Sequence, residues 1–219
     1  MSAITPRNFM KDFFLIKYAP EILRHTLEHL FMVSIAIATA TLIGIPLGIL
    51  ITRKTHLRQP ILGIANILQT IPSLALFGLL IPVPVIGGIG VVPAIFALTL
   101  YSFLPIIRNT YTGITGVDPA IREAGRGMGM TDRQLLLQVE IPLAMGVILA
   151  GVRVSTVISI GIATIAAAIG AGGLGVFIFR GIAVVNNQLI LAGAVPAAMI
   201  ALLADLGIGW LEKKLKVKI

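Results

Sequence analysis

Two stretches of the sequence combine residue types and spacings that bind metals or nucleotides in other proteins. The first, His25-Thr26-Leu27-Glu28-His29, matches the H-x-x-E-H pattern of a class of zinc proteases. On a helix both histidines lie on one face, but a catalytic zinc needs a third protein ligand. Between His29 and Asp118 the chain offers only His56 as a further acid or histidine. We therefore expect an interfacial helix that leads into an apolar span, and we do not expect a metalloprotease.

The second stretch, Gly170-Ala171-Gly172-Gly173-Leu174-Gly175, matches the G-x-G-x-x-G pattern of dinucleotide-binding folds. That site needs a preceding strand, a following helix and an acid about 20 residues further on. Here the motif lies inside an uncharged run, 154–179, and the next acid is Asp205. We therefore expect the glycines to form a tight turn between closely packed helices, and we do not expect a nucleotide site.

Long uncharged runs define the class of the chain. Only 12% of its 219 residues are charged, 57% are hydrophobic, and the mean hydropathy is +1.01. A helix needs about 20 apolar residues to cross the hydrocarbon core of a bilayer. The sequence therefore predicts an all-α integral membrane protein. Its five predicted spans cover residues 30–52, 60–81, 91–107, 145–169 and 188–209.

The predicted organisation has three parts. Residues 1–29 mix charged residues with phenylalanines, which suits an amphipathic helix at the membrane interface. Residues 30–212 form the transmembrane domain, whose longest polar loop is 108–142, and residues 213–219 form a basic tail. The chain has no cysteine, so it has no disulfide framework and no thiol nucleophile.

Lysine and arginine are distributed unevenly between the two sides that five spans create. The side with the tail and the loops 53–58 and 108–142 carries 11 of them, and the other side carries five. Cytoplasmic loops are enriched in these residues, so we expect the tail to be cytoplasmic and the N-terminus to lie outside. The formal net charge of +8 then reflects topology and contact with anionic lipid, and we expect no nucleic-acid binding.

In the polar loop between the third and fourth spans, residues typical of helix starts and ends predict two short helices. Asp118 followed by Pro119 is typical of an N-cap and a first helical position. Gly129 suits the left-handed residue that ends a helix. Thr131, with a glutamine three residues on, predicts a capping box. Pro142 either ends the second short helix or begins the fourth span.

One face of the first short helix is almost bare of side chains. Ala120, Ala124 and Gly127 fall at positions i, i+4 and i+7, and Gly125 thins the helix further. Each glycine inside a helix costs about 1 kcal/mol of helix stability. The pattern therefore suits a backbone that docks closely into a partner's groove or, alternatively, lies flat on the protein's own transmembrane bundle.

This loop resembles the EAA loop of ABC-importer permeases, whose pattern is Glu-Ala-Ala, three residues, Gly, nine residues, then Ile-x-Leu-Pro. The matching residues are Glu123, Ala124, Gly125, Gly129, Val139, Ile141 and Pro142. The spacing agrees throughout, while Gly125, Val139 and Ile141 are the three departures in residue type. The resemblance implies that the loop receives the motion of a separate ATPase and passes it to the spans.

The resemblance extends over most of the chain. The segments LAGVRVSTVISIGIATIAAAIGAGGLGVFIFRGI and ADLGIGWLEKKL are similar to permeases of the glycine betaine/carnitine/choline branch and, more distantly, to the methionine-importer permease. This implies the five-helix core of a type I ABC importer in a bacterial inner membrane. The implied partners are ABC ATPase subunits, an extracytoplasmic substrate-binding protein and a second permease copy or paralogue.

The sequence contains no G-x-x-x-x-G-K-[ST] phosphate loop. We therefore expect ATP and magnesium to bind the partner ATPase. For this chain itself we expect no bound cofactor or metal and no catalytic residue.

Polar residues inside spans are candidates for the solute pathway, because they need a partner or a water-filled cavity. Four of them in the second span are spaced to share one helix face. They are Asn66, Gln69, Thr70 and Ser73, and weaker candidates are Ser102, Ser155 and Ser159. Hydrogen bonding between helices is the alternative role for all of them.

Two charged residues, Arg153 and Asp205, fall within spans, both toward the cytoplasmic end. Either they pair, or Arg153 extends its guanidinium to the interface. An ion-coupled secondary transporter is expected to carry acids near the membrane midplane, whereas Asp205 lies near one end. The sequence therefore favours an ATP-driven permease over an ATP-independent transporter or channel, and over an intramembrane enzyme.

The resemblance alone indicates the solute. It implies a small zwitterionic or quaternary-ammonium compound such as glycine betaine, carnitine or choline, with methionine or another small amino acid as the alternative. Quaternary ammonium groups are typically held by aromatic cages, and with 6% aromatic residues this sequence shows no such cage. We therefore expect selectivity to lie largely in the binding protein.

Overall fold

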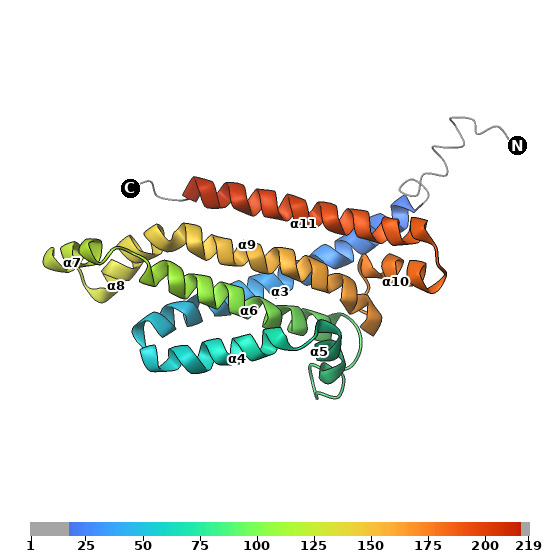
Figure 1. Ribbon diagram of the computed structural model, residues 1–219, viewed down its shortest axis with the longest axis horizontal. Coiled ribbons are helices and arrows are strands. Elements are labelled where there is room, and N and C mark those ends of the chain that lie inside the picture. Colours follow the sequence, from blue (N-terminus) through green and yellow to red (C-terminus); the bar gives the residue numbers. More distant parts are fainter. Residues whose placement is uncertain (1–17, 216–219) are drawn as a thin grey trace, which may run out of the picture. The chain divides into compact units, whose positions relative to one another are not determined.

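The computed structural model describes residues 18–215; most of the predicted interfacial segment (1–17) and the end of the basic tail (216–219) lie outside the described residues. The described part is helical and contains no strand (Figure 1). In chain order the elements are α3 (Ala19–Arg53), η1 (Thr55–Leu57), α4 (Arg58–Thr70), α5 (Ser73–Leu80), α6 (Val91–Thr115), α7 (Pro119–Gly127), α8 (Asp132–Leu135), η2 (Leu136–Glu140), α9 (Ile141–Ile165), η3 (Ala166–Ile169), α10 (Gly175–Ala183) and α11 (Asn187–Leu215).

Within residues 18–215, four helices are long and apolar enough to cross a membrane. They are α3, α6, the continuous helix Asp132–Ile169 that contains α9, and α11. The first, third, fourth and fifth predicted spans lie inside these four helices. The helices extend beyond the predicted ends because polar turns continue them: α6 runs on to Thr115 and α11 to Leu215.

The second predicted span, 60–81, is not one straight helix. Its residues form α4 and α5, which meet at an angle of 100°. Ile71 is extended, with a ψ of 129°, because a residue that precedes a proline avoids the helical region. The hydroxyl of Tyr101 donates a hydrogen bond to the Ile71 carbonyl, which the end of α4 leaves without a helical partner. The expectation of one unbroken helix over 60–81 was wrong at Pro72, and the bent pair α4 and α5 is apolar enough to be a broken span or a re-entrant loop.

Two further segments differ from the predicted pattern. Residues 19–29 belong to the same unbroken helix, α3, as the first predicted span, so no boundary separates them at residue 30. The predicted loop 170–187 contains a helix of nine residues, α10. Its apolar residues were too few to signal a span, and the sequence pattern gave no separate sign of a short helix.

The described residues form two compact units. The first contains residues 18–35, 72–98 and 159–202, and the second contains 36–71, 99–158 and 203–215. The core of the first includes Phe177, Leu189 and Ala192, against which the ring of Tyr18 packs edge-on at 5.9 Å from the Phe177 ring. The second unit holds the polar loop, so the candidate site is built there.

In the second unit, glycines bring α3 and α6 into close contact. A Cβ atom on Gly44 would lie 2.9 Å from Cγ2 of Ile106, and one on Gly48 would lie 2.5 Å from Cβ of Thr110. Glycines four residues apart allow two membrane helices to approach at the backbone. Because both contacts advance by four residues in the same direction, the two helices run parallel here.

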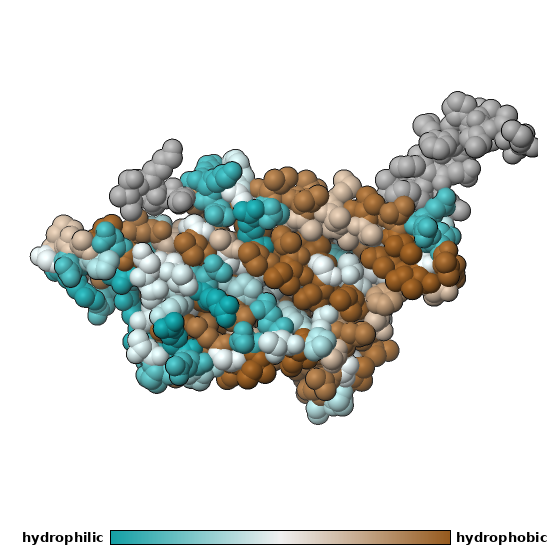
Figure 2. Space-filling model, viewed as in Figure 1, coloured by the Kyte–Doolittle hydropathy of each residue, from teal (hydrophilic) through white to brown (hydrophobic). Residues whose placement is uncertain are grey.

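Large apolar side chains remain exposed along the long helices, and Figure 2 shows them in brown over α11. Leu42, Leu202, Leu203 and Leu206 are each more than half exposed. Exposed apolar area of this extent suits contact with lipid or with another protein. Hydrophilic residues, in teal, gather over α7 and α8 (Figure 2).

Candidate functional site

The helix α7 begins and ends as the sequence predicts. The carboxylate of Asp118 accepts a hydrogen bond of 2.8 Å from the backbone N–H of Ala120, and Pro119 is the first helical residue. The helix ends at Gly127, and Gly129 follows with a φ of 82°. Glycine adopts this left-handed conformation without the steric cost of a Cβ atom.

The capping box at α8 is confirmed. The hydroxyl oxygen of Thr131 accepts a hydrogen bond of 3.3 Å from the Gln134 N–H, and the Gln134 side-chain oxygen accepts one of 2.8 Å from the Thr131 N–H. The helix then continues without a break through η2 into α9. Of the two alternatives for Pro142, the structure places it at the start of the fourth span, as the second residue of α9.

The segment η2 is a π turn, in which hydrogen bonds join residues five apart. Leu135 and Glu140 are both fully buried, although residues five apart on an α-helix point in different directions. The extra residue of the π turn brings the two side chains to the same side. Beyond it, α9 buries Ala144 and Ile148 at steps of four residues, so Glu140 begins the buried face of α9.

Glu140 forms ion pairs with two arginines, one at the end of α3 and one in α7 of the same loop. Arg53, the last residue of α3, donates a hydrogen bond to Oε2, and Nε of Arg122 in α7 lies 3.3 Å from Oε1. Arg122 also donates to the carbonyl of Ile114, near the end of α6. Sequence reasoning missed Glu140. The available signal was that it is the only acid between Asp132 and Asp205.

Gly125 serves packing within the loop. It is buried, and a Cβ atom there would lie 2.8 Å from Cδ1 of Leu135 and 3.2 Å from Sδ of Met130. The space that a side chain at this position would occupy is therefore taken by residues that follow in the same loop. This explains why a helix that resembles the EAA pattern carries glycine in place of its second alanine.

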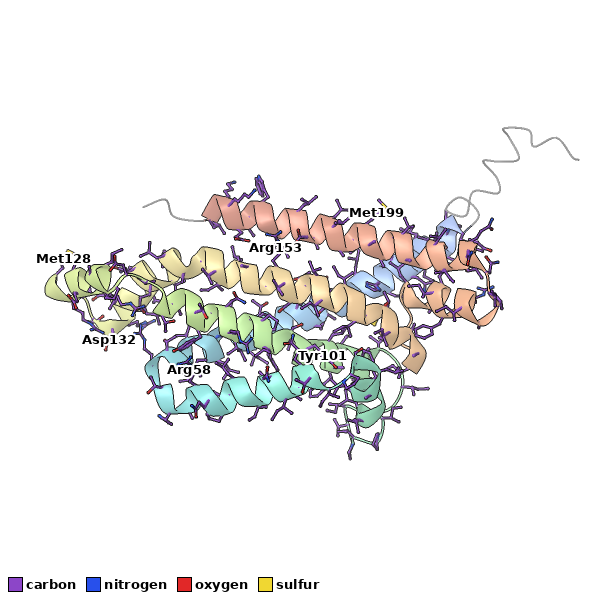
Figure 3. The ribbon with its side chains drawn as sticks, in the orientation of Figure 1. Arg58, Tyr101, Met128, Asp132, Arg153 and Met199 are labelled. Carbon is purple, nitrogen blue, oxygen red and sulfur yellow. The ribbon has the colours of Figure 1, made fainter. Side chains whose placement is uncertain are left out.

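The other small residues of α7 are exposed. Together with an acid and a methionine they form what we term the α7 surface: Ala120, Glu123, Ala124, Gly127 and Met128. The Met128 side chain is 77% exposed at the end of α7 (Figure 3). A Cβ atom on Gly127 would meet no atom within 4 Å. Of the two sequence alternatives, these positions match a surface open to a partner.

The remaining residues of the predicted motif divide by exposure. Gly129 is exposed at the turn, whereas Val139, Ile141 and Pro142 are half-buried where η2 joins α9. The motif thus joins an open surface at one end to the packed start of a long helix at the other.

The sequence matches the profile of one protein family over residues 44–217, described as "Binding-protein-dependent transport system inner membrane component". The chain belongs to this family. It is therefore the permease subunit of an ABC importer and a multi-pass inner-membrane protein. The family and fold class predicted from the sequence are confirmed.

Named relatives agree with this assignment. The chain is 49% identical over 194 residues to the osmoprotectant import permease protein OsmW of Salmonella typhimurium, with 88% of each chain covered. It is 45% identical over 197 residues to the carnitine transport permease protein OpuCB of Listeria monocytogenes, covering 90% of this chain and 89% of the relative. It is 46% identical over 195 residues to the choline permease OpuBB of Bacillus subtilis, covering 89% and 88%.

A solved structure shares the fold. A chain of the MetNI methionine ABC transporter, in an inward-facing conformation, superposes with a TM-score of 0.80 at 25% identity, covering 89% of the permease and 95% of that chain. An amino acid ABC transporter gives a TM-score of 0.72 at 20% identity, which supports the fold alone.

The permease does not keep the four polar residues of the second predicted span on one helix face. Asn66 and Thr70 are exposed on α4 and Gln69 is half-buried, while Ser73 opens α5 beyond the 100° break. The prediction that Ser73 shares their face was wrong, because it assumed a helix unbroken at Pro72. Whether the three residues of α4 line the solute pathway stays a prediction.

The three serine candidates are buried between helices. The hydroxyl of Ser155 in α9 donates a hydrogen bond of 3.0 Å to the carbonyl of Ser102 in α6. Ser102, Ser155 and Ser159 are each no more than 1% exposed. For Ser155 and Ser102 this contact matches the alternative role, a hydrogen bond that joins two spans.

The two charged residues within the spans, Arg153 and Asp205, form an ion pair between α9 and α11. Sequence reasoning had left this pairing open against an Arg153 that extends alone to the interface. Glu212 adds a second acid beside Arg153, at 3.5 Å from Nη1.

The histidines of the H-x-x-E-H stretch have separate partners in α3. His25 contacts the Glu28 carboxylate at 2.7 Å, whereas Nε2 of His29 lies 3.1 Å from the carbonyl of Ile160. Residues 18–215 contain no group of three or more histidines or acids that would hold a metal ion.

The glycine stretch is a tight turn, as expected. Gly170, Gly172 and Gly173 have φ values of 76°, 81° and 74°. The Glu28 carboxylate accepts a hydrogen bond of 3.0 Å from the N–H of Gly173. The pattern that suggested a nucleotide site therefore connects η3 to α10 and is held against α3.

Proposed function

We propose that the permease imports a small zwitterionic or quaternary-ammonium solute of the glycine betaine, carnitine and choline type. The observation that carries this proposal is its identity of 45% to 49%, over most of its length, with permeases named for osmoprotectants, carnitine and choline. Methionine is the second candidate, because the methionine transporter MetNI shares the fold at 25% identity.

In the proposed mechanism this chain provides the route of the solute across the membrane, and other subunits provide the energy for transport. Separate ABC ATPase subunits bind and hydrolyse ATP with magnesium, and their movement reaches the permease through the α7 surface. A row of small side chains supports this role, because it lets the helix backbone approach a partner closely. The half-buried start of α9, at Ile141 and Pro142, then carries the movement into the spans, which alternate access to the two sides.

The proposed assembly contains a second permease copy or a paralogue and an extracytoplasmic substrate-binding protein. The basic residues of 53–58, 108–142 and 213–219 favour a cytoplasmic position for these segments and an external N-terminus. Reporter enzymes active on only one side of the membrane, fused to each terminus in turn, test this orientation. A C-terminal fusion active only outside would overturn it.

The solute is tested by reconstituting the permease with its ATPase and binding protein in liposomes. Labelled glycine betaine, carnitine, choline and methionine are supplied in turn, with and without ATP inside. We expect ATP-dependent uptake of at least one quaternary ammonium compound and none of methionine. Uptake of methionine alone would replace the proposed solute, and equal uptake without ATP or partners would contradict an ATP-driven importer.

The role of the loop is tested with the double variant Glu123→Lys, Gly129→Val. The first change reverses a charge on the α7 surface, and the second places a β-branched residue at a φ of 82°, which is strongly disfavoured. We expect the variant to reach the membrane, to lose co-purification with the ATPase and to lose transport. Gly63→Ala, where a Cβ atom meets nothing within 4 Å, is the control. Normal ATPase binding and transport by the double variant would disprove the assignment.

A further inference from the structure

Glu140 is a carboxylate without access to solvent. Its relative exposure is 0%, although Arg53 and Arg122 beside it are partly exposed. A buried charge is strongly unfavourable unless opposite charges and hydrogen bonds compensate it, and removing one partner leaves the other uncompensated. Each oxygen of the Glu140 carboxylate faces one guanidinium: Oε2 faces Arg53 and Oε1 faces Arg122. The three side chains therefore form one unit, which we term the Glu140 network.

The network joins elements that are far apart in the sequence. Arg53 is the last residue of α3, and Arg122 lies in the middle of α7. Glu140 is the last residue of η2, immediately before α9. Arg122 also donates to the carbonyl of Ile114 in α6. The ends of three long helices, α3, α6 and α9, are thus connected to α7 through these polar contacts.

The π turn is what gives Glu140 this position. Leu135 closes over Gly125 of α7, and five residues later Glu140 reaches the two arginines. In an α-helix a five-residue step would turn one of these side chains away from the other. π turns are infrequent and often occur at functional sites. Here the turn presents both an apolar and a charged contact to the same short helix, α7.

We propose that the Glu140 network transmits displacement of α7 to α3, α6 and α9, so that Glu140, Arg53 and Arg122 are positioning residues for the coupling of ATP hydrolysis to transport. This rests on the proposed function, in which α7 receives the movement of the ATPase. The α7 surface and the network are on different residues: Glu123 and Ala124 are exposed, whereas Glu140 is enclosed. Docking and transmission are therefore separable by mutation.

The first test measures solute imported per ATP hydrolysed by the reconstituted complex. Glu140→Gln keeps the shape of the side chain and removes its charge, while Arg53→Gln and Arg122→Gln each remove one partner. We expect all three variants to retain the ATPase subunit and to hydrolyse ATP, with the import-to-hydrolysis ratio lowered about tenfold. Arg122→Lys, which keeps the charge, should restore part of the ratio, which a purely structural role would not predict.

The control for this test is Asp205→Asn. It also removes one arginine–carboxylate pair, but that pair joins α9 to α11 and does not touch α7. We expect its ratio to stay near that of the wild type. A wild-type ratio in both Arg53→Gln and Arg122→Gln would overturn the proposal, even where Glu140→Gln fails to assemble. Absence of ATP-driven import by the wild type would refute the proposed function instead.

The second test does not depend on transport. The chain contains no cysteine, so Arg126→Cys, in α7 but outside the α7 surface, and Lys54→Cys just after α3 give two unique, exposed labelling sites. In the assembled complex, spin labels at these sites should give a narrow distance distribution with and without ATP, because the network ties α7 to α3. Glu140→Gln should broaden the distribution. An equally narrow distribution in the variant would overturn the proposal.

Discussion

Arg153 on α9 donates two hydrogen bonds to the carboxylate of Asp205 on α11, from Nε to Oδ1 at 2.6 Å and from Nη2 to Oδ2 at 2.8 Å. Figure 3 shows Arg153 directed from α9 toward α11. A Cβ atom on Gly209 would lie 3.1 Å from Nη1 of the arginine. Asp205, Gly209 and Glu212 fall at positions i, i+4 and i+7, so α11 offers one face with two acids and a gap for a single guanidinium.

This arrangement predicts that Asp205 and Arg153 are energetically coupled. Asp205→Asn should lower the melting temperature of the detergent-solubilised permease, because Arg153 loses the carboxylate that accepts two of its hydrogen bonds. Arg153→Gln should lower it similarly, and the double variant should be little worse than either single one. Thermal unfolding of the four proteins measures the coupling. If the decrease in melting temperature of the double variant equalled the sum of the two single decreases, the two residues would not be energetically coupled.

The close approach of α3 and α6 predicts that Gly48 tolerates no side chain. Gly48→Ala places a Cβ atom 2.5 Å from Cβ of Thr110, so the helices must move apart, at a cost of about 1 to 3 kcal/mol. Denaturation in mixed micelles checks this loss. The matched control is Gly63→Ala, which has open space and should stabilise its helix slightly. Equal stability of the two variants would contradict the close contact.

The bend between α4 and α5 predicts a role for the Tyr101 hydroxyl. Tyr101→Phe removes the hydrogen bond to the Ile71 carbonyl and should cost about 1 kcal/mol of unfolding free energy. Tyr111→Phe is the control, because the Tyr111 ring stacks against Arg58 at 4.7 Å and keeps this contact without its hydroxyl. If Tyr101→Phe and Tyr111→Phe unfold at the same denaturant concentration, the bond contributes nothing to the bend.

The sequence predicted the long helices because an uncharged run of sufficient length has few alternatives in a bilayer. It failed at Pro72, where hydropathy stays high on both sides of a break that depends on a single residue. Hydropathy measures how apolar a segment is and not whether its axis turns. The proline before Ser73 was visible, but prolines also lie inside α3, α6 and α11 without ending them.

In the candidate site, the sequence predicted the helix caps and turns correctly, but it did not predict the contacts between residues that are distant in the sequence. Asp118, Thr131 and Gly129 act on neighbours within a few residues, so their roles follow from spacing. The burial of Glu140 depends on Arg53, 87 residues earlier, and on a π turn that has no sequence signature of its own. The packing of Gly125 against Leu135 likewise depends on the fold of the loop, and the sequence showed only that this glycine thins the helix.

The separation of Gly125 from the α7 surface leads to a prediction with two adjacent variants. Ala124→Trp adds a large side chain to the exposed face and should weaken ATPase binding about tenfold or more, because the partner loses its close approach to the backbone. Gly125→Ala adds a methyl group toward Leu135 Cδ1, the movable end of a side chain, and should leave binding almost unchanged. Titration of the ATPase onto the permease in nanodiscs gives both affinities. If Gly125→Ala impairs binding as strongly as Ala124→Trp, the ATPase must reach the buried face of α7, and the division of the helix into a docking face and a packing face is wrong.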